Sequence, residues 1–288
     1  MIEAVVRLSR RLGVLPTLLR ALRKLGLLVV AFRAYEALQS KIPHAPALES
    51  AAGPDDSSGV PLPPSDLMVL VAGTADREWF LTFGAAMFRV IQDALRRDGA
   101  EVTRLRSVLE FGCGCGRVLR YWSSVAGPAI HGIDYNEKLV DWCRRHLGFA
   151  DCRRNRLQPP LPYDDAQFDF VYAISVFTHM SADLQREWMR ELRRVLAPGG
   201  YLFITTHGES FASKLSPEER AAFDRGQLVV RFEEASGMNL CNAYHPTEFV
   251  RHALMEGFEV RQFIPAGTRN AVLQDAYLAA KLRDVAAS

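Results

Sequence analysis

The sequence predicts an α/β fold, a doubly wound and mainly parallel sheet flanked by helices and preceded by a helical extension. Two observations carry this prediction. A short apolar run, 108–111, leads directly into a glycine-rich turn, 112–116, as when a buried strand ends beneath a ligand. From there to Thr206, stretches with strand character alternate with stretches of helical spacing, which is the pattern of βαβ units. We therefore expect one such domain over 66–288.

Composition narrows the classes of function. The chain has 288 residues, of which 49% are hydrophobic and 24% charged, so it can bury a sizeable core. Its formal net charge of +2 gives no reason to expect a nucleic-acid partner. The charge is uneven, however, because residues 1–41 hold eight Lys and Arg against two acids, which leaves about −4 for the remainder. Such an asymmetry indicates attachment to a surface.

The cysteines predict neither a disulfide framework nor a metal site. There are five of them, an odd number, and no two stand in a Cys-x-x-Cys pair. The chain also starts without a compact apolar segment followed by a small-residue cleavage site. We therefore expect a cytoplasmic protein with reduced thiols, associated with a membrane only if its N-terminal helices bind one.

Residues 1–42 predict a basic amphipathic extension of two helices, 2–12 and 17–40, broken at 13–16. In the second helix the apolar side chains form one stripe, and the basic residues lie outside that stripe. Its apolar run 27–32 is far too short to span a bilayer. Two interpretations stay open. The extension packs on the protein itself or on a protein partner, or it lies on an anionic membrane surface.

Residues 43–65 predict a linker, because six prolines and two glycines interrupt any regular pattern. Its end, 59–64, is also compatible with an extended segment fixed on the domain.

Helical spacing then covers 66–98. Beyond the glycine turn we expect strands at 128–133, near 155, at 168–174 and at 201–206, helices at 136–147 and 181–196, a strand pair at 228–232 and 240–244, a helix at 246–256, and final strands at 258–264 and 272–280.

The turn contains Gly112, Gly114 and Gly116, and glycine lets the backbone approach a ligand closely or adopt a positive φ. The dinucleotide-binding fingerprint would place its third glycine at position 117, which is Arg117 here. The stretch instead resembles the first motif of the class I S-adenosylmethionine (SAM) methyltransferases. In that family an acid stands two residues before the first glycine, which is the place of Glu110. The pattern looks like the bacterial methyltransferases associated with small molecules and glycans.

Two later stretches add to the resemblance. Asp134 ends the second expected strand 20 residues after Gly114, where an acid can accept hydrogen bonds from both hydroxyls of a ribose. Residues 155–169 resemble the family segment that runs from the adenine pocket through a Leu-Pro loop into the fourth strand. Many relatives carry Asp where Asn155 stands. Ser175 follows the fourth expected strand, and a Pro-Gly-Gly turn opens the fifth.

The resemblance covers roughly 66–280 and implies a seven-stranded Rossmann-like sheet with SAM as the cofactor and no metal. The residues that match the family's cofactor-binding positions are Glu110, Gly112, Cys113, Gly114, Gly116, Arg117, Asp134, Tyr135, Asn155, Arg156 and Ser175.

The expected function is SAM-dependent methyl transfer to a small-molecule or sugar acceptor, with oxygen as the favoured atom. A hydroxyl acceptor needs a general base, and three histidines stand at or after expected strand ends: His179, His207 and His245. We predict that 208–245 is an acceptor-side insertion, with His207 or His245 nearest the transferred methyl. Two other functions stay open, a non-catalytic SAM-binding subunit of a biosynthetic complex and an NAD-dependent oxidoreductase.

Overall fold

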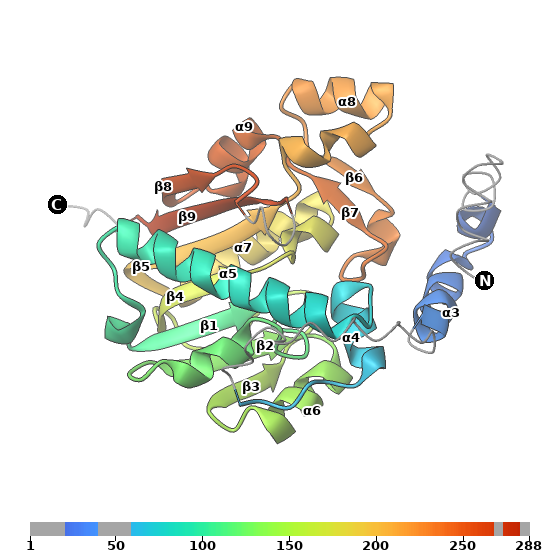
Figure 1. The fold of residues 1–288 in the computed structure, drawn as a ribbon. Coiled ribbons are helices and arrows are strands. Elements are labelled where there is room, and N and C mark those ends of the chain that lie inside the picture. Colours follow the sequence, from blue (N-terminus) through green and yellow to red (C-terminus); the bar gives the residue numbers. More distant parts are fainter. Residues whose placement is uncertain (1–20, 40–58, 268–272, 283–288) are drawn as a thin grey trace.

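The structure, a computed structural model, describes residues 21–39, 59–267 and 273–282 of the chain. The helix expected over 2–12 and most of the linker expected over 43–65 lie outside these residues. Within the described ranges, no helix is long and apolar enough to cross a membrane. Figure 1 shows a twisted sheet at the centre of the domain with helices packed around it.

The N-terminal extension is helical where it is described. A helical turn at 21–24 precedes α3 (Leu28–Gln39). Gly26 lies between them with a φ of +67°, so the longer helix predicted here is interrupted at this residue. After the linker, Val60 and Leu62 pack against the core of the domain. This packing agrees with the extended segment predicted for the end of the linker.

Seven strands form one sheet, as the resemblance implies, and their order is β3-β2-β1-β4-β5-β9-β8. The first five run parallel, whereas β9 is antiparallel to both β5 and β8. Glu110 of β1 stands in register with Gly132 of β2 and Tyr172 of β4, so these three strands end at the same edge, where ligands bind in open α/β sheets. The strands are β1 (Ser107–Phe111), β2 (Ala129–Asp134), β3 (Ala150–Arg154), β4 (Phe168–Ala173), β5 (Leu196–Thr206), β8 (Phe258–Ile264) and β9 (Asp275–Lys281).

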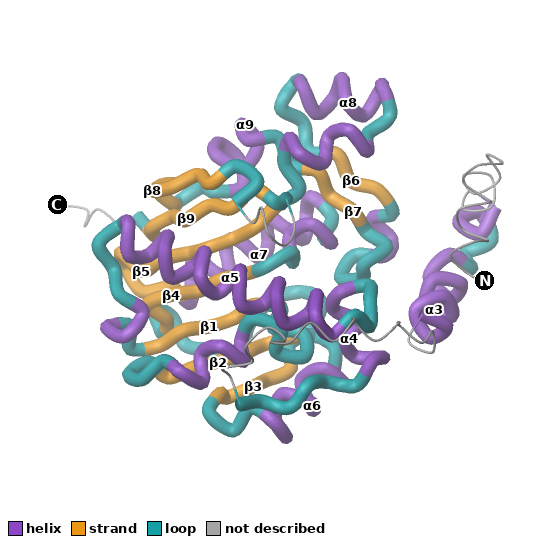
Figure 2. The backbone as a smooth tube through the Cα atoms, viewed as in Figure 1, coloured by secondary structure: helices purple, strands orange, loops and turns teal. Residues whose placement is uncertain are grey.

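Helices cover both faces of the sheet, with α5 in front of it and α7 behind it in the view of Figure 2. Each packs in a separate hydrophobic cluster with strand residues of its own face. Both begin at a side-chain cap, because Asp76 and Ser181 each accept a hydrogen bond from the backbone N–H three residues on. The main helices of the domain are α4 (Ser65–Ala72), α5 (Arg77–Arg97), α6 (Glu137–His146) and α7 (Ala182–Val195).

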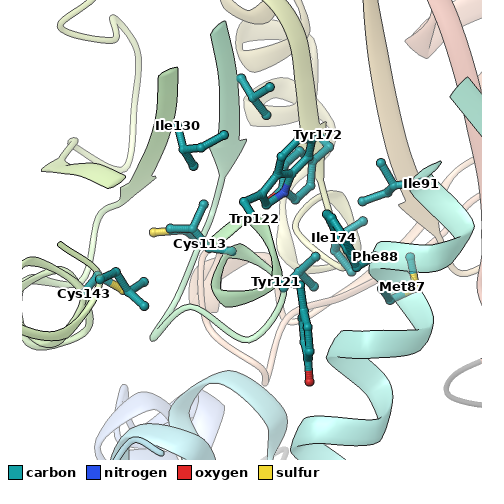
Figure 3. Close-up of a cluster of buried hydrophobic side chains, with 14 of the residues drawn as sticks. Met87, Phe88, Ile91, Cys113, Tyr121, Trp122, Ile130, Cys143, Tyr172 and Ile174 are labelled. Carbon is teal, nitrogen blue, oxygen red and sulfur yellow. The ribbon is translucent and has the colours of Figure 1, made fainter. Parts of the chain in front are cut away.

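Aromatic side chains fill the core between α5 and the sheet (Figure 3). Trp122 meets Phe88 edge to face at 5.3 Å between ring centroids, and its Nε1 donates a hydrogen bond to Tyr172 OH at 2.8 Å. Residues 119–124, directly after the glycine turn, form a 3-10 helix. Side chains on both sides fix this segment, because Tyr121 OH donates to a carbonyl of α5 at 2.9 Å. The glycine turn is thereby anchored to α5 and β4.

The irregular stretch between β5 and β8 contains the predicted strand pair. α8 (Pro217–Asp224) comes first, and β6 (Val229–Arg231) then pairs antiparallel with β7 (Asn242–Tyr244). The single helix expected before the last two strands is instead a short α9 (Thr247–Phe249) followed by a π-helical turn, Val250–Leu254.

Candidate active site

The glycine turn lies at the carboxyl end of β1. Gly112, Gly114 and Gly116 have φ values of +75°, +55° and +80°, all in the left-handed region that favours glycine. A Cβ at Gly114 would lie 2.7 Å from a methyl of Val71, and one at Gly116 would lie 2.7 Å from a methyl of Leu147. A side chain at either position would therefore strain the backbone and collide with a neighbour.

A cavity of about 640 Å³ adjoins this turn at the ends of β1, β2 and β4. Its volume falls in the range of sites that bind small molecules. Gly116 faces α6 and is not part of the wall, and among the described residues no group of His, Cys, Asp and Glu is arranged to hold a metal ion. The other ten predicted cofactor-binding residues all line the cavity: Glu110, Gly112, Cys113, Gly114, Arg117, Asp134, Tyr135, Asn155, Arg156 and Ser175.

Asp134 stands at the end of β2 with its carboxylate held in place. Its Oδ2 accepts a hydrogen bond from Gly114 N at 2.9 Å, and its Oδ1 accepts one from Asn136 N at 2.8 Å. Burial raises the pKa of this carboxyl to about 6, although the two N–H groups favour the charged form. A carboxylate has about four acceptor positions. Asp134 therefore keeps capacity for hydrogen bonds from a ligand.

Glu110 and Arg117 both line the cavity. Glu110 Oε2 accepts a hydrogen bond from Tyr172 OH at 2.9 Å, and burial raises the pKa of its carboxyl to about 8. The Arg117 guanidinium lies 3.9 Å from the ring centroid of Phe83 and 5.4 Å from that of Trp79, a cation–π arrangement. Its buried Nε has no hydrogen-bond partner within the described part of the chain. An anionic ligand group would satisfy this donor.

Asn155 presents an unpaired acceptor at the end of β3. Its Nδ2 donates to Arg156 O at 2.7 Å, whereas its buried Oδ1 has no partner among the residues described. Ser175 is fixed at the end of β4 with a φ of +60°. Its N–H donates to Thr205 Oγ1 at 2.8 Å, and its Oγ donates to Gln274 Oε1 at 2.9 Å. The cavity thus has a free amide oxygen on one side and a rigid backbone turn on the other.

His179 lines the cavity just beyond β4. Its Nδ1 lies 2.7 Å from Cys241 O. Because a carbonyl oxygen only accepts hydrogen bonds, Nδ1 carries the proton and Nε2 keeps its lone pair. Burial lowers the pKa of the imidazole below its usual 6.5, so the ring is neutral at pH 7. It is therefore oriented and charged as a proton acceptor.

His207 and His245 are not among the residues that line this cavity. The ring of His207 stacks on Phe211 at 4.2 Å between centroids, and burial lowers its pKa to about 2. His245 is fully buried, its Nε2 donates to Gln185 Oε1 at 3.1 Å, and burial lowers its pKa to about 3. Both rings are buried in the fold. The expectation that one of them lies nearest the transferred methyl gains no support from this geometry, which favours His179.

Comparison with known proteins identifies the domain that holds this cavity. Residues 109–204 match the family model Methyltransf_11, a methyltransferase domain. The chain contains a SAM-dependent methyltransferase domain. The matched range includes the glycine turn, Asp134 and His179, and SAM is the cofactor of such domains.

Relatives of the methyltransferase domain cover only part of the chain. A putative methyltransferase of Encephalitozoon cuniculi (strain GB-M1) is 37% identical over 113 residues, 39% of this chain and 50% of that protein. A chloroplastic tocopherol O-methyltransferase of Arabidopsis thaliana is 29% identical over 130 residues, 42% of this chain and 37% of that protein. The chain thus spans half the length, or less, of these relatives. A solved SAM-dependent methyltransferase from Mesorhizobium loti shares the fold, with a TM-score of 0.51 at 18% identity over 67% of this chain and 98% of that one.

A second wall of the cavity comes from segments outside the matched methyltransferase range. The sequence predicted 232–241 as part of an acceptor-side insertion, but it did not predict that 21–39 also lines the cavity. We call this wall the cover and define it as residues 21–39 and 232–241. Tyr135 OH donates a hydrogen bond to Gly237 O at 2.6 Å, and Gly237 N donates to His179 O at 2.7 Å. The cover is therefore bonded to the ends of β2 and β4. Its members in the cavity wall are Arg33, Glu36, Ala37, Gly237, Met238 and Asn239.

The two halves of the cover hold each other over the methyltransferase domain. Leu28 of α3 forms a hydrophobic cluster with Leu240 and Cys241. Arg23 Nε lies 2.8 Å from Glu234 Oε1, in an ion pair between residues 211 positions apart. No local spacing in the sequence marks contacts of this kind.

Proposed function

We propose that the protein transfers a methyl group from SAM to an oxygen atom of a small-molecule or sugar acceptor. The observation that carries the proposal is the position of His179, whose ring lines the same cavity as the glycine turn and Asp134. A proton acceptor and a nucleoside-sized site thus share one space. Methyl transfer to a hydroxyl requires this proximity.

The unsatisfied groups of the cavity fit the parts of SAM. Asp134 takes the ribose hydroxyls with the acceptor positions that its two backbone bonds leave free. Asn155 Oδ1 takes the exocyclic amine of the adenine. Arg117 faces the carboxylate of the methionine end, and Glu110 offers a hydrogen-bond acceptor to its ammonium. In this arrangement the buried Nε of Arg117 and the buried Oδ1 of Asn155, which lack a partner in the described part of the chain, each gain one of matching polarity.

SAM supplies a methyl group that is already activated on a sulfonium. The residues of the chain must align the acceptor oxygen with it and remove a proton. As the oxygen–carbon bond forms, the carbon–sulfur bond breaks and its electron pair stays on sulfur. The hydroxyl proton passes to His179 Nε2, because Nδ1 is already engaged with Cys241 O. A carboxylate acceptor would need no such base.

The names of two relatives support oxygen as the acceptor atom. One is the tocopherol O-methyltransferase already described, and the other is a fatty-acid O-methyltransferase of Mycolicibacterium smegmatis (strain ATCC 700084 / mc(2)155). The latter is 31% identical over 142 residues, 46% of this chain and 50% of that protein. The partial coverage limits the proposal to a class of acceptor, one with a hydroxyl or carboxyl group.

Calorimetry with SAM, S-adenosylhomocysteine (SAH) and NAD tests the proposal at its first step. We expect SAM and SAH to bind at one site per chain and NAD to give no heat. Formation of SAH is then followed with a panel of hydroxyl and carboxyl acceptors. SAM binding without turnover on any acceptor would favour the non-catalytic subunit, and binding of NAD alone would favour the oxidoreductase.

A further inference from the structure

The buried face of α3 carries one acidic residue. Leu28, Phe32 and Glu36 follow each other at intervals of four and form one stripe of the helix. The first two pack with the apolar residues of 232–241. Glu36 is only 9% exposed and lines the cavity instead. A buried carboxylate on a helix face of this kind calls for a partner.

No described residue supplies that partner. Within the ranges that the structure describes, Glu36 makes no hydrogen bond and no ion pair shorter than 4.0 Å, and Arg33 acts on it only as a nearby charge. Burial raises the pKa of the Glu36 carboxyl to about 7. The carboxyl group therefore has free capacity to accept hydrogen bonds from a ligand in the cavity.

The position of Glu36 along α3 decides which part of the cavity it faces. At the other end of the stripe, Leu28 packs on Cys241, whose carbonyl holds His179. Eight residues of helix separate Leu28 from Glu36 by about 12 Å. Glu36 lines the same cavity as Tyr135 and Asn136, the two residues that follow Asp134. By its distance along α3, Glu36 lies away from the contact that holds His179, and we assign it to the nucleoside end of the cavity.

We propose that Glu36 accepts a hydrogen bond from the adenosyl half of the cofactor, so that α3 completes the cofactor site of the domain. This inference rests on the proposed function, because it takes SAM as the ligand. The donors available in an adenosyl group are the ribose hydroxyls and the exocyclic amine. Asp134 and Glu36 would then hold the nucleoside from the sheet and from the cover.

Calorimetry with SAH and with adenosine tests this inference on full-length variants. Glu36→Ala removes the acceptor, and we expect it to weaken both ligands by about tenfold or more. Glu36→Gln keeps the shape and one acceptor oxygen, and we expect a smaller loss for both. Glu78→Ala is the matched control, since Glu78 is an exposed helical acid outside the cavity wall. Thermal unfolding of each variant checks that the fold is retained.

The outcomes separate this inference from the proposed function. If wild type binds SAH and both Glu36 variants bind it within twofold of wild type, the inference is wrong and the proposed function stands. If SAH weakens while adenosine does not, Glu36 contacts the amino-acid half and the adenosyl assignment is wrong. If wild type binds neither SAM nor SAH, the proposed function itself fails.

Discussion

The two walls of the cavity are built in different ways. The wall at the strand ends consists of the glycine turn, Asp134 and neighbouring residues of the sheet, and its key bond joins positions 20 apart. The cover joins distant segments, and its bond between Tyr135 and Gly237 spans 102 positions. We therefore assign the groups that bind the cofactor to the strand-end wall, which forms together with the hydrophobic core. The cover encloses the site and adds contacts to it.

The walls also differ in how firmly they are held. The glycine turn is anchored through buried aromatic residues such as Trp122, which is 0% exposed. The ion pair between Arg23 and Glu234 in the cover has side chains that are 59% and 36% exposed, and such pairs contribute little. Segments with few buried contacts open more readily than the core. We therefore expect substitutions in the strand-end wall to abolish binding and substitutions in the cover to change its rates.

The largest effect is expected for Gly114→Val. The valine would need a φ near +55° and would collide with Val71, so the turn cannot keep its shape. SAH binding by calorimetry should be lost. Gly99→Val is the matched control, because Gly99 has a φ of +80° with no heavy atom near its Cβ position. Equal SAH affinity in the two variants would show that the turn does not hold the cofactor.

Substitution of His179 should lower turnover more than it lowers cofactor affinity. Removing a general base typically costs about 10²–10⁴-fold in rate, so His179→Ala should lose this much in kcat with SAH affinity nearly unchanged. The pKa of His179 lies below 6.5, so the contribution of this base to turnover should be constant above pH 7 and fall only at lower pH, as the ring takes up a proton. His207→Ala is measured alongside. An equal loss there, with His179→Ala active, would move the base to His207.

The sequence predicted the strand-end wall because its signals are local. The glycine spacing, the acid of Asp134 and the alternation of strands with helices all follow from patterns within short windows, and the strand pair at 228–244 was predicted in the same way. The histidines gave equal signals, because His179 and His207 both follow strand ends. The direction of the side chain distinguishes the two histidines, because the ring of His207 stacks on Phe211 whereas His179 lines the cavity. In the sequence, Glu36 looks like an ordinary charged residue of an amphipathic helix. Its position in the cavity wall follows only from the folded structure.

A smaller effect is expected where the cover meets the strand-end wall. Tyr135→Phe removes the 2.6 Å hydrogen bond to Gly237 O, a loss of about 0.5–1.5 kcal/mol. The cover should open more often, so SAH should dissociate several-fold faster and amides near Gly237 should exchange faster. Tyr201→Phe is the control, because its bond to Asp98 lies elsewhere in the fold. Unchanged dissociation in Tyr135→Phe would mean that the cover does not gate the site.

The smallest effect concerns the outer face of the cover, where we expect α3 to contact an anionic membrane. Leu27 and Val30 are 48% and 64% exposed, and Lys24 accompanies them as an exposed cation. Leu27→Gln with Val30→Gln should reduce cosedimentation with phosphatidylglycerol vesicles a few-fold and leave SAH binding unchanged. Leu282→Gln, at another exposed leucine, should have no effect. Wild type that sediments no better with phosphatidylglycerol than with phosphatidylcholine vesicles would exclude the membrane and leave packing on protein as the role of this face.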